Sequence, residues 1–393
     1  MSRSRLLLGA GALSALALVA AAQPALATHG GDTLVSVGSP IGPFSANKQN
    51  EPALAVDQHA PNFLAAGFND EIDIEKCAVG DPRVCPFTQG VGVSGIYFSF
   101  DSGHTWTQPT YRGWTARDTT AENQGHAGPI GTLPKYYENG LVSDGDPALA
   151  FGPRRGANGA FSWSNGSRLY YANLASNFSG SRTEGRIKGF EAIGVSRTDD
   201  VHAAAAGNAN AWKAPVIAAK NSATTFADKE QIWADNAASS PHFGSVYVCY
   251  AEFRSNSQGN ALPTPLVVTT STNGGDTWTK KQVGPAVNNG HKGLPDGCTV
   301  RTDSLGNVYV FGLGKPTNNG PTGEVMYRST DGGQHWARPM LVAPAVQPGI
   351  IDPVLGRPVM DGVAGAGLTL PRRPASTSPT GHRRDRMPPT RSS

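Results

Sequence analysis

Arginines, aromatic rings and carboxylates gather in a few segments of the chain, and in combination they could bind an acidic sugar. Residues 108–143 contain Arg112, Trp114, Arg117, Tyr136 and Tyr137. A guanidinium can bind a carboxylate through two parallel hydrogen bonds, and an aromatic face can pack against a pyranose ring. We therefore expect the two arginines, Trp114 and Tyr136 to bind substrate.

Two further segments add carboxylates and a third arginine. Asp70 belongs to the acidic segment 69–92, and Glu252 lies two residues before Arg254 in segment 251–263. Arg254 would extend the set of substrate-binding guanidinium groups. A second interpretation stays open, in which each of these residues is a solvated loop charge or packs between sheets.

The elements that must position these residues follow from a repeated pattern, S-x-[DN]-x-G-x-x-W. Its three copies are Ser99, Asp101, Gly103 and Trp106; Ser271, Asn273, Gly275 and Trp278; and Ser329, Asp331, Gly333 and Trp336. Glycine permits positive φ, an aspartate or asparagine oxygen accepts backbone N–H groups, and tryptophan packs between sheets. Because catalytic residues are seldom copied into every repeat, we expect these corners to be structural.

Each copy belongs to a larger unit of short apolar strands. The order within a unit is acidic entry, strand, strand, strand, corner and a last strand, which predicts an all-β chain of four-stranded antiparallel blades forming a β-propeller. We count four blades and the start of a fifth at Met360. In the second unit, Ile193–Asp200 followed by Trp212 resembles a stretched corner.

The meander also predicts where binding takes place. The corner between the third and fourth strands lies on the same side as the turn between the first and second. The longer links lie on the opposite side, so we expect ligands there.

The acidic entries form another candidate site. Glu51, Asp146, Asp228 and Asp296 precede or begin the innermost strands, so their carboxylates could converge on the rim of a central channel. Such crowding would raise some pKa values or bind a cation such as calcium. Alternatively, each carboxylate caps its own turn.

The repeated corners resemble the Asp boxes, or BNR repeats, of the sialidase superfamily, over about Asn50–Met360. The resemblance implies a six-bladed propeller. Hydrolytic members use three arginines, a tyrosine nucleophile activated by glutamate, and an acid or base aspartate, so it implies Glu252, Asp70 and Tyr137 as catalytic candidates. The chain departs from the family at Asn50-Glu51-Pro52, where those members have a phenylalanine-arginine-isoleucine-proline stretch.

Two functions remain open. The first is a secreted glycoside hydrolase similar to exo-sialidases that acts on extracellular glycans or glycoproteins. The second is a non-catalytic propeller that binds a carbohydrate or a protein. Neither requires a cofactor, although calcium could bind. An incomplete ring would leave unpaired strand edges and favour self-association.

Composition sets the remaining expectations. Residues 1–27 read as a signal peptide cleaved after Ala27, followed by a lead-in at 28–49, the propeller at 50–366 and a disordered tail at 367–393. No later segment is apolar enough to span a membrane. Without the signal and the segment from Pro371 onward, the chain has 25 basic and 29 acidic residues, which gives no support for nucleic-acid binding.

The four cysteines favour disulfides over metal ligation in an exported chain. Cys77 and Cys85 enclose a short loop, which leaves Cys249 to pair with Cys298. Neither CxxC nor HExxH spacing occurs, so a zinc site has no support.

Overall fold

The computed structural model describes residues 31–42, 45–76, 88–120, 124–178, 186–287, 295, 297–317, 319–345 and 351–357. The chain divides into Met1–Thr33 and Leu34–Ser393, and all the strands belong to the second unit. The predicted signal peptide, the Cys77–Cys85 pair, Asp296, the start of a fifth blade at Met360 and the tail lie outside the described residues. Among those described, no helix is both long and apolar enough to cross a membrane.

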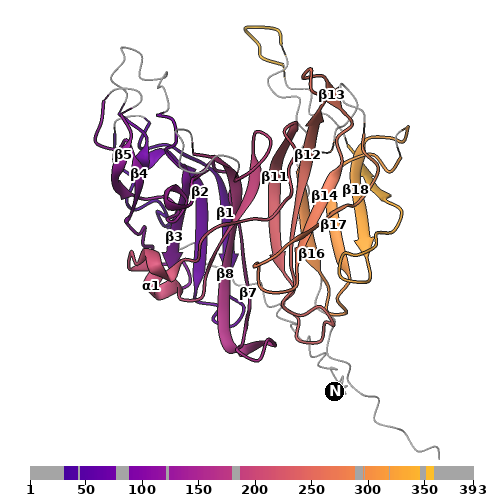
Figure 1. Cartoon of the computed structure of the whole chain (residues 1–393), viewed down its shortest axis with the longest axis horizontal. Helices are drawn as coiled ribbons and strands as arrows, with labels where there is room; N and C mark the ends of the chain where they lie inside the picture. Colours follow the sequence, from indigo (N-terminus) through magenta and orange to yellow (C-terminus); the bar gives the residue numbers. More distant parts are fainter. Residues whose placement is uncertain are drawn as a thin grey trace, which may run out of the picture. The chain divides into compact units, whose positions relative to one another are not determined.

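Four antiparallel sheets follow one another along the chain (Figure 1). The first contains β1 (Gln49–Val56), β2 (Leu64–Asp70) and β3 (Ser94–Ser99). The second contains β7 (Ala148–Arg155), β8 (Phe161–Asn177), β9 (Ala192–Thr198) and β10 (Val216–Ile217), with β6 (Leu141–Ser143) paired to β8. The third contains β11 (Thr225–Ala234), β12 (Val246–Ser255), β14 (Leu266–Ser271) and β15 (Thr279–Gln282), with β13 (Ala261–Leu262) paired to β12. The fourth contains β16 (Cys298–Thr302), β17 (Val308–Gly314), β18 (Gly323–Ser329) and β19 (Met340–Pro344).

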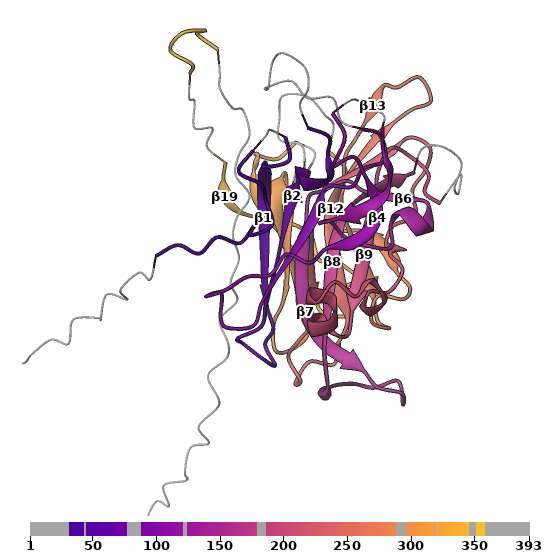
Figure 2. The same cartoon turned by 90° about the vertical axis from the view of Figure 1, so that its left-hand side faces the viewer.

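These sheets are the blades of a β-propeller, and the predicted all-β fold is confirmed. The innermost strands β1, β7, β11 and β16 contact one another in chain order, and Figure 2 shows β1 and β7 side by side. The first blade departs from the predicted four strands. Its last strand is reduced to a single bridge between Phe98 and Thr107, because the chain then leaves the blade for the hairpin of β4 (Tyr111–Thr115) and β5 (His126–Ile130).

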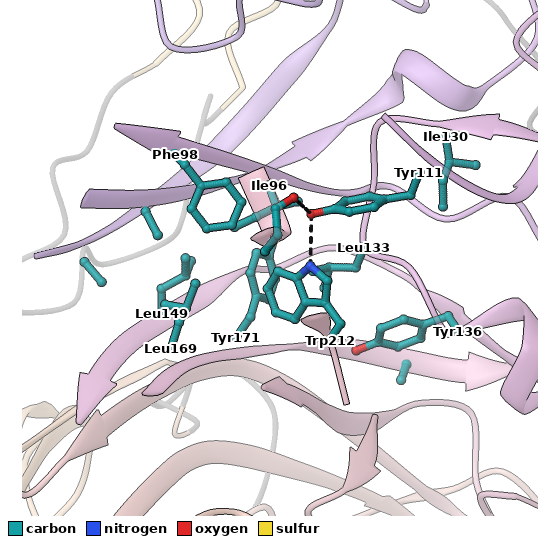
Figure 3. Close-up of a cluster of buried hydrophobic side chains, with 14 of the residues drawn as sticks. Ile96, Phe98, Tyr111, Ile130, Leu133, Tyr136, Leu149, Leu169, Tyr171 and Trp212 are labelled. Atoms are coloured by element: carbon teal, nitrogen blue, oxygen red, sulfur yellow. Dashed lines mark hydrogen bonds between the residues drawn. The ribbon is translucent and has the colours of Figure 1, made fainter. Parts of the chain in front are cut away.

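Alternating apolar residues of neighbouring blades make the core between them. Ile96 and Phe98 of the first blade pack with Leu169 and Tyr171 of the second (Figure 3). Trp212 is buried in the same cluster, where its Nε1 donates to the Tyr111 hydroxyl over 2.9 Å. This bond gives the one polar atom of a buried indole a partner.

The three S-x-[DN]-x-G-x-x-W corners make the same hydrogen bonds. In each, the serine Oγ accepts from the N–H of the glycine four residues later, over 2.9, 2.8 and 2.9 Å. The tryptophan Nε1 donates to that glycine's carbonyl over 3.1 Å in all three. Asn273 accepts from Thr277 N over 3.0 Å, as Asp101 accepts from Thr105 N over 2.9 Å. An amide oxygen at this position of the corner therefore accepts the same backbone hydrogen bond as a carboxylate.

The second blade has the same corner with an insertion. Asp200 N donates to Thr198 Oγ1 over 3.1 Å, and Lys213 N donates to Arg197 O over 2.9 Å. The second contact matches Ala337 N to Arg328 O at 2.8 Å in the fourth blade. Between these contacts the chain forms α1 (Val201–Ala205) and the 3-10 turn η3 (Ala209–Ala211).

The strands thus end on two faces. The corners and α1 lie at one end, which we call the corner face, and the β4–β5 hairpin and β13 lie at the other, which we call the loop face (Figure 1). The predicted disulfide between Cys249 and Cys298 is confirmed. It joins β12 to β16, and both cysteines are buried. The third and fourth blades are therefore covalently linked.

Candidate functional site

The entries to the innermost strands share a backbone conformation. Glu51, Asp146, Lys229 and Gly297 have φ values of 53°, 50°, 55° and 74°. Positive φ is uncommon outside glycine, so these four residues mark equivalent positions of the four blades. Asp228, the residue predicted for the third blade, lies one position earlier, and its Oδ1 accepts from Lys229 N over 2.8 Å. It caps its own turn, and the blade presents a lysine where the sequence suggested a carboxylate.

This lysine joins the two neighbouring carboxylates. Lys229 Nζ lies 3.0 Å from Asp146 Oδ2 and 3.4 Å from Glu51 Oε1. Asn69 connects the same two residues, donating to Glu51 Oε2 over 3.3 Å and accepting from Asp146 N over 2.6 Å. The hydrogen bond with Asp146, followed by burial, raises the pKa of Glu51. Burial raises the pKa of Asp146, but the hydrogen bonds from Glu51 and Lys229 outweigh it and hold that pKa below its ordinary value.

The ammonium group of Lys229 thus offsets the repulsion between the carboxylates of Glu51 and Asp146. Burial alone would lower the pKa of Lys229, and the bond to Asp146 and the surrounding charges raise it instead. Lys229 therefore stays charged and places a cation between the carboxylates of Glu51 and Asp146. Within the described ranges, no group of three or more His, Cys, Asp or Glu side chains is arranged to hold a metal ion.

More buried carboxyls lie near this rim. Burial raises the pKa of Glu191 to about 8, and the negative charges of Asp144 and Asp228 add to the shift. Burial also raises the pKa of Glu230 well above its ordinary value. Both side-chain oxygens of Glu230 lack a hydrogen-bond partner. The rim between the second and third blades therefore favours neutral carboxylic acids.

Asp70, a predicted catalytic residue, is fully engaged with its surroundings. It is buried, and it accepts from the Tyr97 hydroxyl, from Gln108 Nε2 over 2.8 Å and from Ile72 N over 3.0 Å. Burial, followed by the charge of Asp70, raises the pKa of Tyr97. These contacts place Asp70 at the start of the 3-10 turn η1 (Glu71–Asp73), which it caps.

Arg117 binds a carboxylate of the protein itself. Its Nη2 and Nε lie 2.6 and 3.1 Å from Oδ1 of Asp73, which is fully buried. Asp73 also accepts from the backbone N–H groups of Gly131 and Thr132. Burial raises the pKa of Asp73, against the opposing effect of Arg117. The pair fastens the β4–β5 hairpin to the link that follows β2.

Three aromatic residues of segment 108–143, Trp114, Tyr136 and Tyr137, line one small pocket. Trp114 stacks on Tyr137 with ring centroids 5.1 Å apart, and Phe178 meets both rings edge-on. Tyr136 is buried, and its hydroxyl donates to Asn173 Oδ1. Arg112, on β4, is exposed.

Glu252, another predicted catalytic residue, lies in the third blade. Arg254 Nη2 lies 2.7 Å and Lys280 Nζ 2.5 Å from its carboxylate. Asp70 and Tyr137 have no part in this cluster. The predicted site residues are therefore dispersed. Trp114, Tyr136 and Tyr137 line one small pocket, Arg117 pairs with Asp73 in the turn that Asp70 caps, and Arg254 pairs with Glu252.

The sequence did not single out the polar pocket between the first two blades. This inter-blade pocket has a volume of about 470 Å³ and lies on the loop face. Its polar lining includes Lys48, Asn50, Asn69, Glu71, Gln89, Asp144, Ser176 and Asn177. Among the described residues of the lining, Lys48 is the only lysine or arginine, and its Nζ lies 2.7 Å from Glu71 Oε1.

Two of the described lining residues, Glu71 and Asp144, carry carboxyl groups. Burial raises the pKa of Asp144 to about 6, while hydrogen bonds from Ser176 act in the opposite direction. Asp144 Oδ2 and Glu71 Oε2 are buried and lack a hydrogen-bond partner. The lining combines amides, which bind hydroxyl groups, with two carboxyls that could handle a proton. The clue in the sequence was Asp144, two residues before the acidic entry Asp146.

No family model and no curated protein matches the chain. Among solved structures it is similar to Hadza microbial sialidase Hz136, with a TM-score of 0.41 and 11% identity over 77% of this chain and 48% of that one. It is also similar to a leech intramolecular trans-sialidase, with a TM-score of 0.41 and 10% identity over 76% and 51%. A third match is a protein of unknown function from Dyadobacter fermentans, with a TM-score of 0.41 and 13% identity over 76% and 70%. The chain spans about half the length of both sialidases, and these likenesses concern the fold alone.

Proposed function

We propose that this chain is an extracellular propeller that binds a neutral glycan in the inter-blade pocket. The observation that carries the proposal is the pocket's lining, in which the exposed amides of Asn50 and Gln89 border a volume of about 470 Å³ on the loop face. That volume is within the range of small-molecule sites, and amides offer both donors and acceptors to sugar hydroxyls.

The charges of the lining favour a neutral sugar over a carboxylated one. Lys48 is already paired with Glu71, and Asp144 adds a second carboxyl. Arg112, Arg117 and Arg254, predicted from the sequence to bind a sugar carboxylate, are not among the described residues that line this pocket. Within the part of the lining that the structure describes, a sialic acid carboxylate would therefore find no guanidinium to receive it.

Glycan-array screening followed by calorimetry tests the proposal. Gln89→Ala and Asn50→Ala remove exposed amides from the lining, and each should weaken binding of the selected oligosaccharide about fivefold, the effect of one hydrogen bond of about 1 kcal/mol. Gln334→Ala, an exposed glutamine in a corner of the fourth blade, is the matched control and should bind as the wild type does. Failure of every neutral glycan to bind, or equal affinity in all three variants, would contradict the proposal.

A second function, glycoside hydrolysis, is favoured by one observation. Asp144, with its pKa raised to about 6, shares the pocket with Glu71, and a carboxylic acid with a raised pKa is suited to protonate a leaving group. A panel of fluorogenic glycosides, including a sialoside, would reveal turnover. Asp144→Asn should then abolish turnover and leave binding within a few-fold of the wild type. Binding without turnover on the whole panel leaves the chain a binding module.

A further inference from the structure

A second pocket lies on the loop face in the third blade, and its chemistry differs from that of the inter-blade pocket. It has a volume of about 360 Å³. Its walls are mainly apolar and come from Phe190, Phe226, Phe253, Ala261 and Leu262, with Thr224, Ser255, Gly259 and Thr264 completing the lining. Arg254 is the only charged residue among the described residues that line it.

The apolar walls are open to solvent. Phe190 is 69% exposed and Leu262 is 41% exposed. The Phe226 and Phe253 side chains, from directly paired positions of β11 and β12, have ring centroids 6.0 Å apart. Large apolar side chains that stay exposed around one concave surface are typical of a binding site.

The charge beside these walls is positive. Arg254 donates through Nε and Nη2 to a single oxygen, Oε1 of Glu252, over 2.8 and 2.7 Å. The other carboxylate oxygen, Oε2, receives Lys280 Nζ over 2.5 Å. One carboxylate is thus shared by two cations, and the cluster keeps a net charge of +1.

From these walls and this charge we infer that the third-blade pocket binds a small carboxylate with an aromatic or branched apolar body. The apolar body packs between Phe190, Phe253 and Leu262, and the carboxylate lies toward Arg254. Aromatic walls provide the larger part of the contact area, and the surplus positive charge selects the anion. This site is independent of the glycan pocket and uses none of its residues.

The experiment uses 3-phenylpropionate as the probe, with 3-phenylpropanamide and 3-phenylpropylamine as neutral and cationic partners of the same shape. Saturation-transfer NMR locates contact and calorimetry gives the affinity. The wild type should bind the carboxylate at least fivefold more tightly than the amide. It should bind the amine more weakly than either of them. Equal affinity for all three probes would overturn the charge argument.

Two variants replace exposed side chains of the pocket wall, so they should fold like the wild type and change only the affinity for the probe. Phe190→Ser and Leu262→Ser should each weaken binding of the carboxylate fivefold or more. Leu305→Ser changes a leucine that is 61% exposed in the turn joining β16 and β17, and it should have no effect. Arg254→Gln should abolish the preference for the carboxylate over the amide. If Phe190→Ser and Leu262→Ser bind like Leu305→Ser, the assigned site is wrong.

Discussion

Replacing Asp73 with alanine should destabilise the protein more than a single change in any other ion pair among the described residues. The carboxylate has no exposed surface, and its Oδ1 and Oδ2 together accept from Arg117, from the N–H groups of Gly131 and Thr132, and from Thr132 Oγ1 over 2.8 Å. Without it, two backbone donors and a hydroxyl remain buried and unpaired. Removing one partner of such a buried pair costs about 3–5 kcal/mol.

The expected loss is at the lower end of that range, about 3 kcal/mol. Burial opposes the charged form of Asp73, as its raised pKa shows, so part of the loss is offset when the charge is removed. Arg117, whose side chain is 30% exposed, regains water. In a protein of this size about 3 kcal/mol corresponds to a decrease in Tm of roughly 4 °C.

Differential scanning calorimetry and urea unfolding measure the change. The matched control is Asp118→Ala in the same hairpin segment, because Asp118 and His126 form an exposed pair at 3.3 Å. Exposed pairs contribute about 0–1 kcal/mol, so this variant should unfold with the wild type. A loss below about 1 kcal/mol for Asp73→Ala would refute the view that this carboxylate holds the β4–β5 hairpin in place.

Three further changes test the disulfide, one of the corners and a buried carboxyl group. Replacing both Cys249 and Cys298 with serine opens a link across 49 residues, and the lost chain constraint should lower the free energy of unfolding by about 4 kcal/mol; a loss below 1 kcal/mol would contradict this. Ser271→Ala leaves the N–H of Gly275 without its 2.8 Å partner and should lower the free energy of unfolding by about 1–2 kcal/mol. If this variant unfolds like the wild type but loses ligand binding, the corner is a binding site and not a structural element. Because burial raises the pKa of Glu191 to about 8, its protonated form stabilises the fold, and that stability declines as the pH rises from 4.5 through 8. The free energy of unfolding of Glu191→Gln should therefore match that of the wild type at pH 4.5 and exceed it at pH 9. The full pKa shift corresponds to about 5 kcal/mol, and solvent screening of this partly exposed group reduces the expected difference to about 2 kcal/mol. An equal difference at both pH values would refute the assignment.

The propeller could be predicted because its signals are local. Each corner places a serine, an acceptor, a glycine and a tryptophan at fixed offsets, and each offset corresponds to one hydrogen bond in the structure. The stretched corner of the second blade could also be recognised, since α1 is inserted between contacts that the other blades make directly. Alternating apolar residues then define the strands on either side.

The register of the strand entries could not be predicted in the same way. In the first two blades the residue with positive φ is acidic and precedes a proline, at Glu51 and Asp146. In the third it is Lys229, which follows an aspartate. When the blades are aligned by their acidic residues, Asp228 is placed opposite Glu51. The positive φ values show that Lys229 is the residue equivalent to Glu51. A single sequence shows which residues are acidic, but φ depends on the pairing of the strand that follows.

Arg117, Glu252 and Arg254 were predicted to act in a binding or catalytic site because a sequence does not show which charged residues pair with one another in the fold. Arg117 and Asp73 are 44 positions apart, and only the fold brings them to 2.6 Å. Glu252 and Arg254 are adjacent on one strand face, which makes mutual pairing the default for them. Once such pairs are formed, the inter-blade pocket is left with exposed amides such as Asn50 and Gln89, whose side chains carry no charge. That pocket therefore depends on residue types that no sequence pattern marks.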